Sequence, residues 1–180
     1  MTSPLLVTYA SEHGSTREVA AAIAARLRTE DLEVELRPAS EVTDVTPYCG
    51  VILGGALYVG RLHAEAVGFL RRHRAKLAVF PIAVFALGPR TLEPSDLASS
   101  RSQLERALAK VPEVSPYETA VFGGVINPKT LRFPLSHLHA SDARDWDEID
   151  AFAARCAEVY DYGKAAAALG DLRTDIPQTH

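Results

Sequence analysis

The chain has 180 residues, a formal net charge of −4, 47% hydrophobic residues and 23% charged residues. This length fits one domain, because a body of this size buries roughly 70% of the surface that its unfolded chain exposes. The acidic balance argues against nucleic acid as a partner, since proteins that bind its backbone use dense Lys and Arg surfaces.

The sequence shows no pattern of a membrane span, a leader or a metal framework. Apolar runs stay well short of the roughly 18 residues that a span requires. Residues 1–4 lead straight into a strand-like run, without a basic region or a cleavage site. Cys49 and Cys156 lack zinc or disulfide spacing, and His137 and His139 have no third partner nearby. We therefore expect a cytoplasmic protein with no transmembrane segment and no metal site.

The beginning of the chain predicts a strand, a loop and a helix. The apolar run Leu5–Tyr9 stops at a polar loop, after which Val19 to Leu27 carries apolar residues at helical spacing. Ser15 and Glu18 have the spacing of a capping box, which predicts that the helix starts at the end of this loop.

The remaining chain continues the alternation of strands and helices. Strands are predicted at 32–36, 51–56, 79–86 and 119–124, and helices at 62–74, at 95–110 and from near Asp145, where Asp145 and Glu148 again have capping-box spacing. The alternating pattern at 32–36 indicates an edge strand, and Pro81 indicates that its strand pairs mainly after this residue. Five strands alternating with helices predict an α/β fold with a doubly wound, five-stranded parallel sheet and helices on both faces.

Two segments stand apart from this pattern. The connection from Asn127 to Arg144 is long for a compact domain, and such loops are usually functional or poorly ordered. Residues 163–180 are interpreted as a C-terminal extension, partly frayed, which leaves 1–162 as the domain.

The loop after the first strand has the chemistry of a phosphate site. It offers backbone N–H groups, the positive end of a helix dipole, the hydroxyls of Ser11, Ser15 and Thr16, and Gly14 for close approach. It matches neither the dinucleotide fingerprint nor the triphosphate loop, so a phosphomonoester is the better candidate. The alternative is that Ser15 and Glu18 only cap the helix and the other hydroxyls face water.

Several motifs resemble one known family. The segment Tyr9–Ala20 resembles the phosphate loop of flavodoxins, and Gly54–Arg61 resembles their second flavin loop. The pattern of Gly54, Gly60 and His63, together with Asp145-Trp146 at the last helix, is most similar to menaquinone-dependent protoporphyrinogen dehydrogenases. The resemblance covers about residues 5 to 160, and it implies the flavodoxin-like strand order 2-1-3-4-5 and FMN as cofactor.

The resemblance also implies which residues contact FMN. The first loop would hold the phosphate with Ser11, Glu12, His13, Gly14, Ser15 and Thr16. The second would line one side of the isoalloxazine with Ala56, Leu57, Tyr58, Val59 and Gly60. The other side would be lined by Leu87, Gly88, Pro89 and Arg90, with Gly123 and Gly124 following the fifth strand. Because no motif indicates acid–base catalysis by the protein, no catalytic residue is assigned and the reactive atoms would belong to the cofactor.

The predicted function is therefore FMN-dependent electron transfer, by either an electron carrier or a small oxidoreductase of the protoporphyrinogen dehydrogenase type. Those dehydrogenases carry a longer, more hydrophobic insertion at 127–144, whereas Phe133 is the only aromatic here. The expected reaction partner is a redox protein or a small acidic substrate, and a homodimer is left open. Arg61 and the segment 71–76 make the helix predicted at 62–74 and its flanks basic, which is either a solvated face or a docking surface.

Two other functional classes are alternatives to this prediction. A phosphoacceptor signalling module needs an aspartate ending its third strand, where this chain has Gly54-Gly55-Ala56. A flavin-free, degenerate interaction domain is the remaining alternative, although the hydroxyls and glycine of the first loop are intact.

Overall fold

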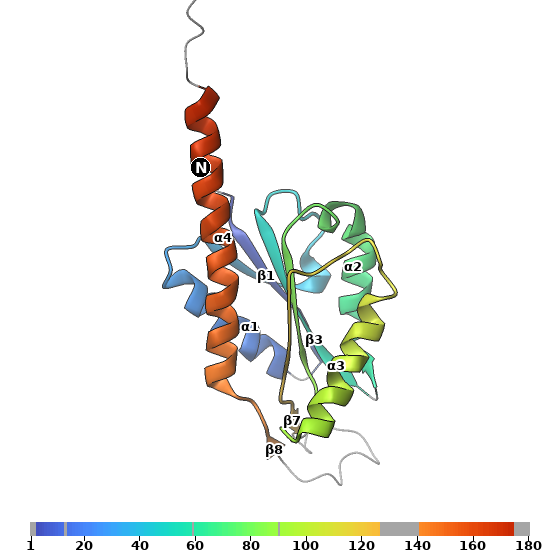
Figure 1. The fold of residues 1–180 in the computed structure, drawn as a ribbon. Helices are drawn as coiled ribbons and strands as arrows, with labels where there is room; N and C mark the ends of the chain where they lie inside the picture. The colour runs from blue at the N-terminus through green and yellow to red at the C-terminus, as the bar shows by residue number, and fades with distance from the viewer. Residues whose placement is uncertain (1–2, 13, 59, 90, 127–140, 175–180) are drawn as a thin grey trace, which may run out of the picture.

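The parallel sheet predicted from the sequence forms the centre of the protein (Figure 1). The structure is a computed structural model that describes residues 3–12, 14–58, 60–89, 91–126 and 141–174. Its sheet contains β1 (Leu5–Ala10), β2 (Val34–Pro38), β3 (Gly50–Tyr58), β5 (Ile82–Leu87) and β6 (Glu118–Phe122) in the order β2-β1-β3-β5-β6, and all neighbours are parallel. The predicted order 2-1-3-4-5 is confirmed, because these are the five predicted strands in sequence order.

Short strands add a hairpin to β3 and form a separate two-stranded sheet. The two-residue strand β4 (Arg61–Leu62) forms a hairpin with the end of β3, and β7 (Val125–Ile126) pairs antiparallel with β8 (Ser141–Asp142). A 3₁₀ turn, η1 (Ala39–Glu41), follows β2.

Helices cover both faces of the sheet (Figure 1). On one face, α1 (Ser15–Arg28) and α4 (Trp146–Thr174) pack over Val7, Ile52 and Phe85. On the other, α2 (Ala64–Leu77) and α3 (Pro94–Leu108) pack over alternate residues of the same strands. Side chains of a strand alternate between its two faces, so each central strand contributes to both cores and reads as a continuous apolar run.

The helix and strand boundaries follow local chemistry. The strand predicted at 79–86 begins only at Ile82, since Pro81 has no N–H to donate and Val79 is 78% exposed. Asp145 caps α4 as expected, because its Oδ1 accepts from the N–H groups of Asp147 and Glu148 at 3.1 Å each. No helix in the described part of the chain is long and apolar enough to cross a membrane.

His73 does not belong to the basic surface of α2. Its side chain is buried at 7% exposure, and its ring packs 4.7 Å from that of Phe69. Burial lowers the pKa of His73, which favours the neutral imidazole. The exposed positive charge of α2 therefore comes from its arginines and Lys76.

The close packing of β3 against β5 generates a stability prediction. A Cβ built on Gly54 would lie 2.2 Å from Cζ of Phe85, whereas a Cβ built on Gly68 of α2 meets nothing within 4 Å. We expect Gly54→Ala to lower the free energy of unfolding by about 1–3 kcal/mol through overpacking. The matched variant Gly68→Ala should be neutral or stabilised by up to about 1 kcal/mol, because alanine favours a helix. Urea unfolding of both variants checks this; equal stabilities would contradict the tight contact.

Candidate cofactor site

Three loops meet where the parallel strands end. Ala10 pairs with Gly55, and Gly55 with Ala86, so the parallel pairing of β1, β3 and β5 ends at nearly the same level of the sheet, while β3 continues to Tyr58 in its hairpin with β4. The loops that follow them are the three flavin loops expected from the sequence. Ligands of open α/β sheets bind at this edge, beside the position where the strand order reverses.

The first loop enters α1 through a glycine. Gly14 has φ +87°, a left-handed conformation that favours glycine, and its carbonyl accepts from the N–H of Glu18 at 3.0 Å. The Gly14 N–H in turn donates to Oγ of Ser11 at 3.0 Å. The predicted capping box of Ser15 and Glu18 is therefore wrong: Gly14 is the N-cap residue, and no side chain caps the helix. The Ser15 hydroxyl is not used as a helix cap.

Thr16 is the most informative residue of this loop. Its side chain is completely buried, yet among the described residues its Oγ1 has no hydrogen-bond partner. Such a group is costly, because burial removes water without a replacement bond. Thr16 also lies in the first turn of α1, where N–H groups lack acceptors within the helix and the dipole is positive. An anion at this turn would satisfy both needs. His13 lies outside the described residues.

The second loop is a tight hairpin. Tyr58 pairs with Arg61 across the turn, and Gly60 has φ +76°, which again favours glycine. Val59 lies outside the described residues, Ala56 is buried in β3, and Leu57 and Tyr58 are partly exposed at the end of that strand. Burial, and then the charge of Glu12, raise the pKa of the Tyr58 phenol, so it stays protonated at neutral pH.

His63 joins the first two loops. Its Nδ1 accepts from the N–H of Glu65, which caps α2 and leaves the ring proton on Nε2. That Nε2 lies 3.6 Å from Oε1 of Glu12, and the ring meets Tyr58 edge-on with centroids 6.1 Å apart. Glu12 is thus directed from the first loop toward the second.

The third loop is held by the end of β6. The Gly88 N–H donates to the Phe122 carbonyl at 3.0 Å, and the Gly124 N–H donates to the Pro89 carbonyl at 2.8 Å. Gly88 and Pro89 line a cavity of about 320 Å³ together with Leu57 and Gly60, so the structure brings the second and third loops together. Arg90 lies outside the described residues.

Three predicted contact residues have roles in packing. The side chain of Leu87 is buried in the core at 3% exposure, so its backbone is the part that reaches the sheet edge. A Cβ on Gly123 would lie 1.8 Å from the Ala143 carbonyl oxygen, and one on Gly124 would lie 2.9 Å from that of Gly88. Close backbone packing accounts for both glycines.

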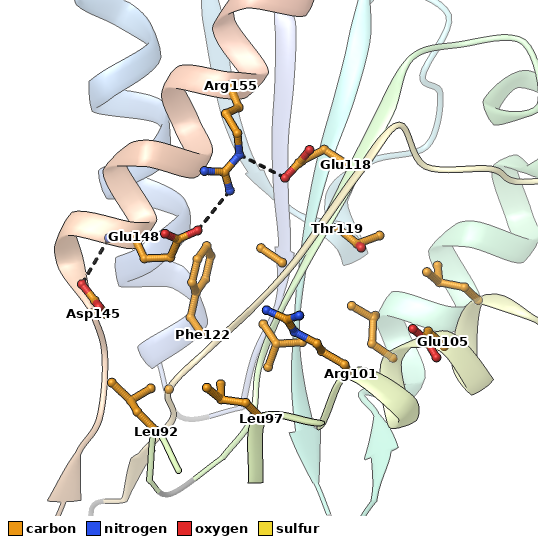
Figure 2. A pocket seen from close by; sticks show the side chains of 15 residues that line it. Leu92, Leu97, Arg101, Glu105, Glu118, Thr119, Phe122, Asp145, Glu148 and Arg155 are labelled. Carbon is orange, nitrogen blue, oxygen red and sulfur yellow. Dashed lines mark hydrogen bonds and ion pairs between the residues drawn. The ribbon is translucent and has the colours of Figure 1, made fainter. Parts of the chain in front are cut away.

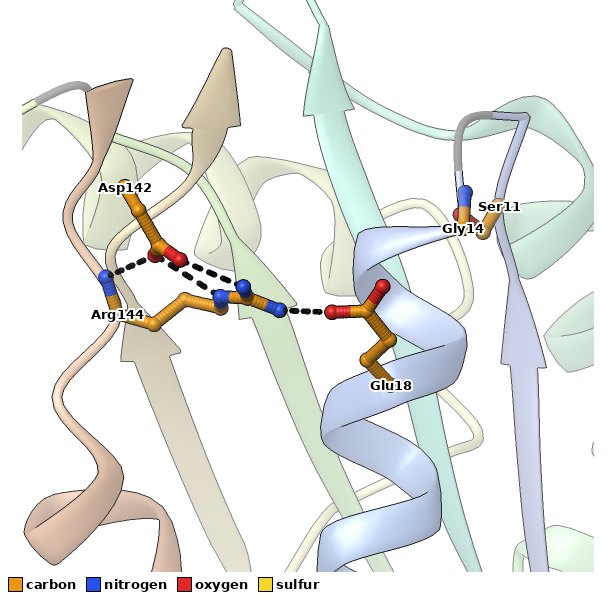
Figure 3. A network of polar contacts seen from close by, with 5 residues as sticks. All are labelled: Ser11, Gly14, Glu18, Asp142 and Arg144. Carbon is orange, nitrogen blue, oxygen red and sulfur yellow. Dashed lines mark hydrogen bonds and ion pairs between the residues drawn. The ribbon is translucent and has the colours of Figure 1, made fainter. Parts of the chain in front are cut away.

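An arginine network beside the first loop was not predicted as a unit. The Arg144 side chain is only 10% exposed and donates to the carboxylates of Asp142 and Glu18 (Figure 3). Its guanidinium also lies 4.8 Å from the centroid of the Trp146 ring. These contacts tie the segment before α4 to the first turn of α1, and they offset the charge of Glu18 in that turn. The sequence shows the charged residues of 142–145, but it does not indicate that Glu18 is the distant partner of Arg144.

A further cavity lies away from these loops. A groove of about 580 Å³ follows the edge strand β6 between α3 and α4 (Figure 2). Three of its charged residues are already paired, since Arg155 contacts Glu118 at 3.2 Å and Glu148 at 3.1 Å. The three converging loops, and not this groove, are the candidate cofactor site, because they follow the strand ends at which open α/β sheets bind their ligands. Within the same described ranges, no group of three or more His, Cys, Asp or Glu residues could hold a metal ion.

The burial of Arg144 generates a stability prediction. We expect Arg144→Met to lower the free energy of unfolding by about 1–2 kcal/mol, because it leaves two carboxylates without their charge-assisted partner. The matched variant Arg74→Met removes an exposed pair with Glu113 at 3.8 Å and should cost less than about 0.5 kcal/mol. Equal losses in urea unfolding would show that the network contributes no more than a surface ion pair.

The same network generates a pH dependence. Hydrogen bonding from Arg144 lowers the pKa of Asp142 below its ordinary value of 3.8. The stabilisation from the Asp142 carboxylate is therefore fully present above the pKa that this group has in the unfolded chain. It is lost as the pH falls through the lower pKa of the group in the folded protein. We expect the stability difference between the wild type and Asp142→Asn to be constant above about pH 5 and to shrink toward pH 3. A difference that grows on acidification would contradict this assignment.

The fold is shared with several solved structures. Flavodoxin 1 of Bacillus cereus aligns with a TM-score of 0.56 at 19% identity, covering 84% of this chain and 95% of that chain. Flavodoxin 2 of the same organism gives 0.54 at 24% identity, covering 86% and 98%. The rubredoxin oxygen:oxidoreductase of Desulfovibrio gigas gives 0.58 at 14% identity and covers 88% of this chain, which spans 36% of that longer one. At these identities the likeness establishes the fold alone.

Sequence comparison adds the family. No curated protein matches the chain. A family model for the flavodoxin domain matches residues 6–134, which is more than half of the chain. The chain therefore belongs to the flavodoxin domain family.

Proposed function

We propose that this protein binds FMN at the three converging loops and transfers electrons through it. The observation that carries the proposal is the completely buried, unpartnered hydroxyl of Thr16 at the N-terminus of α1. A phosphate at this turn would accept from that hydroxyl and from the free N–H groups of the first helical turn.

The neighbouring residues suit the same ligand. The Ser11 hydroxyl accepts from Gly14, which leaves its own O–H to donate to a phosphate. The Ser15 hydroxyl is not used as a cap, and Gly14 has open space around its Cβ position. The first loop thus offers hydroxyls and amides, while its carboxylate at Glu12 is directed to His63.

The second and third loops would hold the ring system. Tyr58 provides an aromatic face, and the backbones around Gly60 and Gly88 provide donors and acceptors for the polar rim. Bound FMN would supply one- and two-electron chemistry, and these residues would orient it and limit the access of water.

The narrower role of a protoporphyrinogen dehydrogenase is a second candidate, supported by the pattern of Gly54, Gly60 and His63. The geometry also gives His63 a structural role, as the cap of α2 and the contact of Glu12. Adding protoporphyrinogen anaerobically to the FMN-loaded protein separates the candidates. Bleaching of the flavin absorbance would support the enzyme, and an unchanged spectrum would favour a carrier.

The buried hydroxyl of Thr16 leads to a prediction about FMN binding. We expect Thr16→Val to weaken FMN binding about ten- to a hundredfold, because a hydrogen bond to a charged phosphate is lost. The free protein should be equally stable or more stable, because an unsatisfied buried hydroxyl is removed. Titration of the apoprotein, followed by flavin fluorescence, measures the affinity.

Two controls make this test specific. Thr8 also has a buried, unpartnered Oγ1, but it lies inside β1 between Arg37 and Leu53 of the adjacent strands. Thr8→Val should leave FMN affinity unchanged. Riboflavin, which lacks the phosphate, should bind wild type and Thr16→Val equally. An unchanged FMN affinity in Thr16→Val would show that the phosphate does not bind at this turn.

A further inference from the structure

A second concave surface lies between α2 and α3 on the helix-covered face opposite α1. This groove, the α2–α3 groove, has a volume of about 440 Å³ and an apolar floor that includes Leu62, Val67 and Ala107. Four cationic side chains surround the floor: Arg61, Arg71, Arg106 and Lys110.

Helical spacing places these residues together. The groove is lined from α2 by residues 64, 67, 68 and 71, and from α3 and its end by residues 103, 106, 107 and 110. Within each set the residues recur three or four positions apart, so each set shares one helix face. Gly68 lies in the middle of the α2 set, and a Cβ there would meet nothing within 4 Å. Packing therefore does not require this glycine, and its effect is to keep the groove open.

The charge of the groove is unbalanced. Among the residues that the structure describes, no carboxylate lines it, although the whole chain carries a net charge of −4. Across the described ranges, the four cations form no ion pair, whereas Arg26, Arg74 and Arg155 all contact carboxylates. Uncompensated like charges around one concavity repel one another and attract an anionic partner.

The groove adjoins the proposed FMN loops. Gly60 lines both the groove and the cavity of about 320 Å³ between the second and third loops, and so does Gln103. A partner seated on the groove would therefore contact the hairpin that forms one side of the cofactor site.

We propose that the α2–α3 groove is the docking surface for a protein partner that presents an acidic segment. All four cations are exposed at the rim, and none of them is buried against the floor. Exposed, flexible cations suit the electrostatic steering of a protein, whereas small-molecule sites fix their ligands with enclosed polar groups. The docking itself does not depend on flavin, but its role in electron transfer rests on the proposed function.

Binding of a fluorescein-labelled octaglutamate peptide tests the proposal. Fluorescence anisotropy is measured with the full-length protein, with and without FMN, at about 20 mM salt, where screening is weak. The double variant Arg71→Glu/Arg106→Glu should bind about tenfold more weakly or worse. Its control, Lys76→Glu/Arg101→Glu, changes the same charge on the same two helices outside the groove and should stay within about twofold of wild type. Circular dichroism verifies that every variant is folded.

A third variant separates docking from diffuse attraction. Gly68→Leu fills the groove without changing charge and should weaken peptide binding severalfold. The proposal is overturned if wild type binds no peptide, if both double variants lose affinity equally, or if Gly68→Leu binds as wild type does. Binding to vesicles of anionic phospholipid but not to the peptide would also overturn it. Peptide binding by a protein that takes up no FMN would support the docking surface and refute the flavin assignment alone.

Discussion

The alignment of three parallel strand ends is the constraint on which the site depends. Tyr9, Gly54 and Phe85 pair across β1, β3 and β5, one or two residues before the parallel pairing of these strands ends. The ring of Phe85 occupies the space that a side chain at position 54 would need, so glycine lets the strands keep this register. A shift by one residue would turn every side chain of a strand to the opposite face and separate the loops.

The electrostatics of the first loop follow from that arrangement. The N-terminus of α1 is positive, and two carboxylates close to it in sequence are each directed elsewhere. Glu12 faces His63 at the start of α2, and Glu18 contacts Arg144 in the segment before α4. With these negative charges engaged, the hydroxyls and N–H groups of the turn remain for an anion. The buried hydroxyl of Thr16 is the group that most needs one.

Periodicity in the sequence predicted the fold, because buried strands and amphipathic helices leave local patterns, and even the effect of Pro81 on its strand was foreseen. Contacts between distant segments left no such signal. The spacing of Ser15 and Glu18 matches a capping box, yet Glu18 pairs with Arg144, 126 positions away. His73 lies among arginines in sequence but faces the core, since its position on α2 is on the buried stripe. The convergence of the loops could be expected from topology, whereas the partners of their side chains required the three-dimensional structure.

The central claim is that the first turn of α1 encloses the phosphate of FMN. Phosphorus NMR of the protein incubated with FMN tests it most directly, because a free phosphomonoester titrates near pH 6. The account predicts one bound resonance whose chemical shift stays constant between about pH 5 and 8, since fixed donors hold the dianion. A resonance that titrates like free FMN, or a protein that retains no FMN, would contradict it.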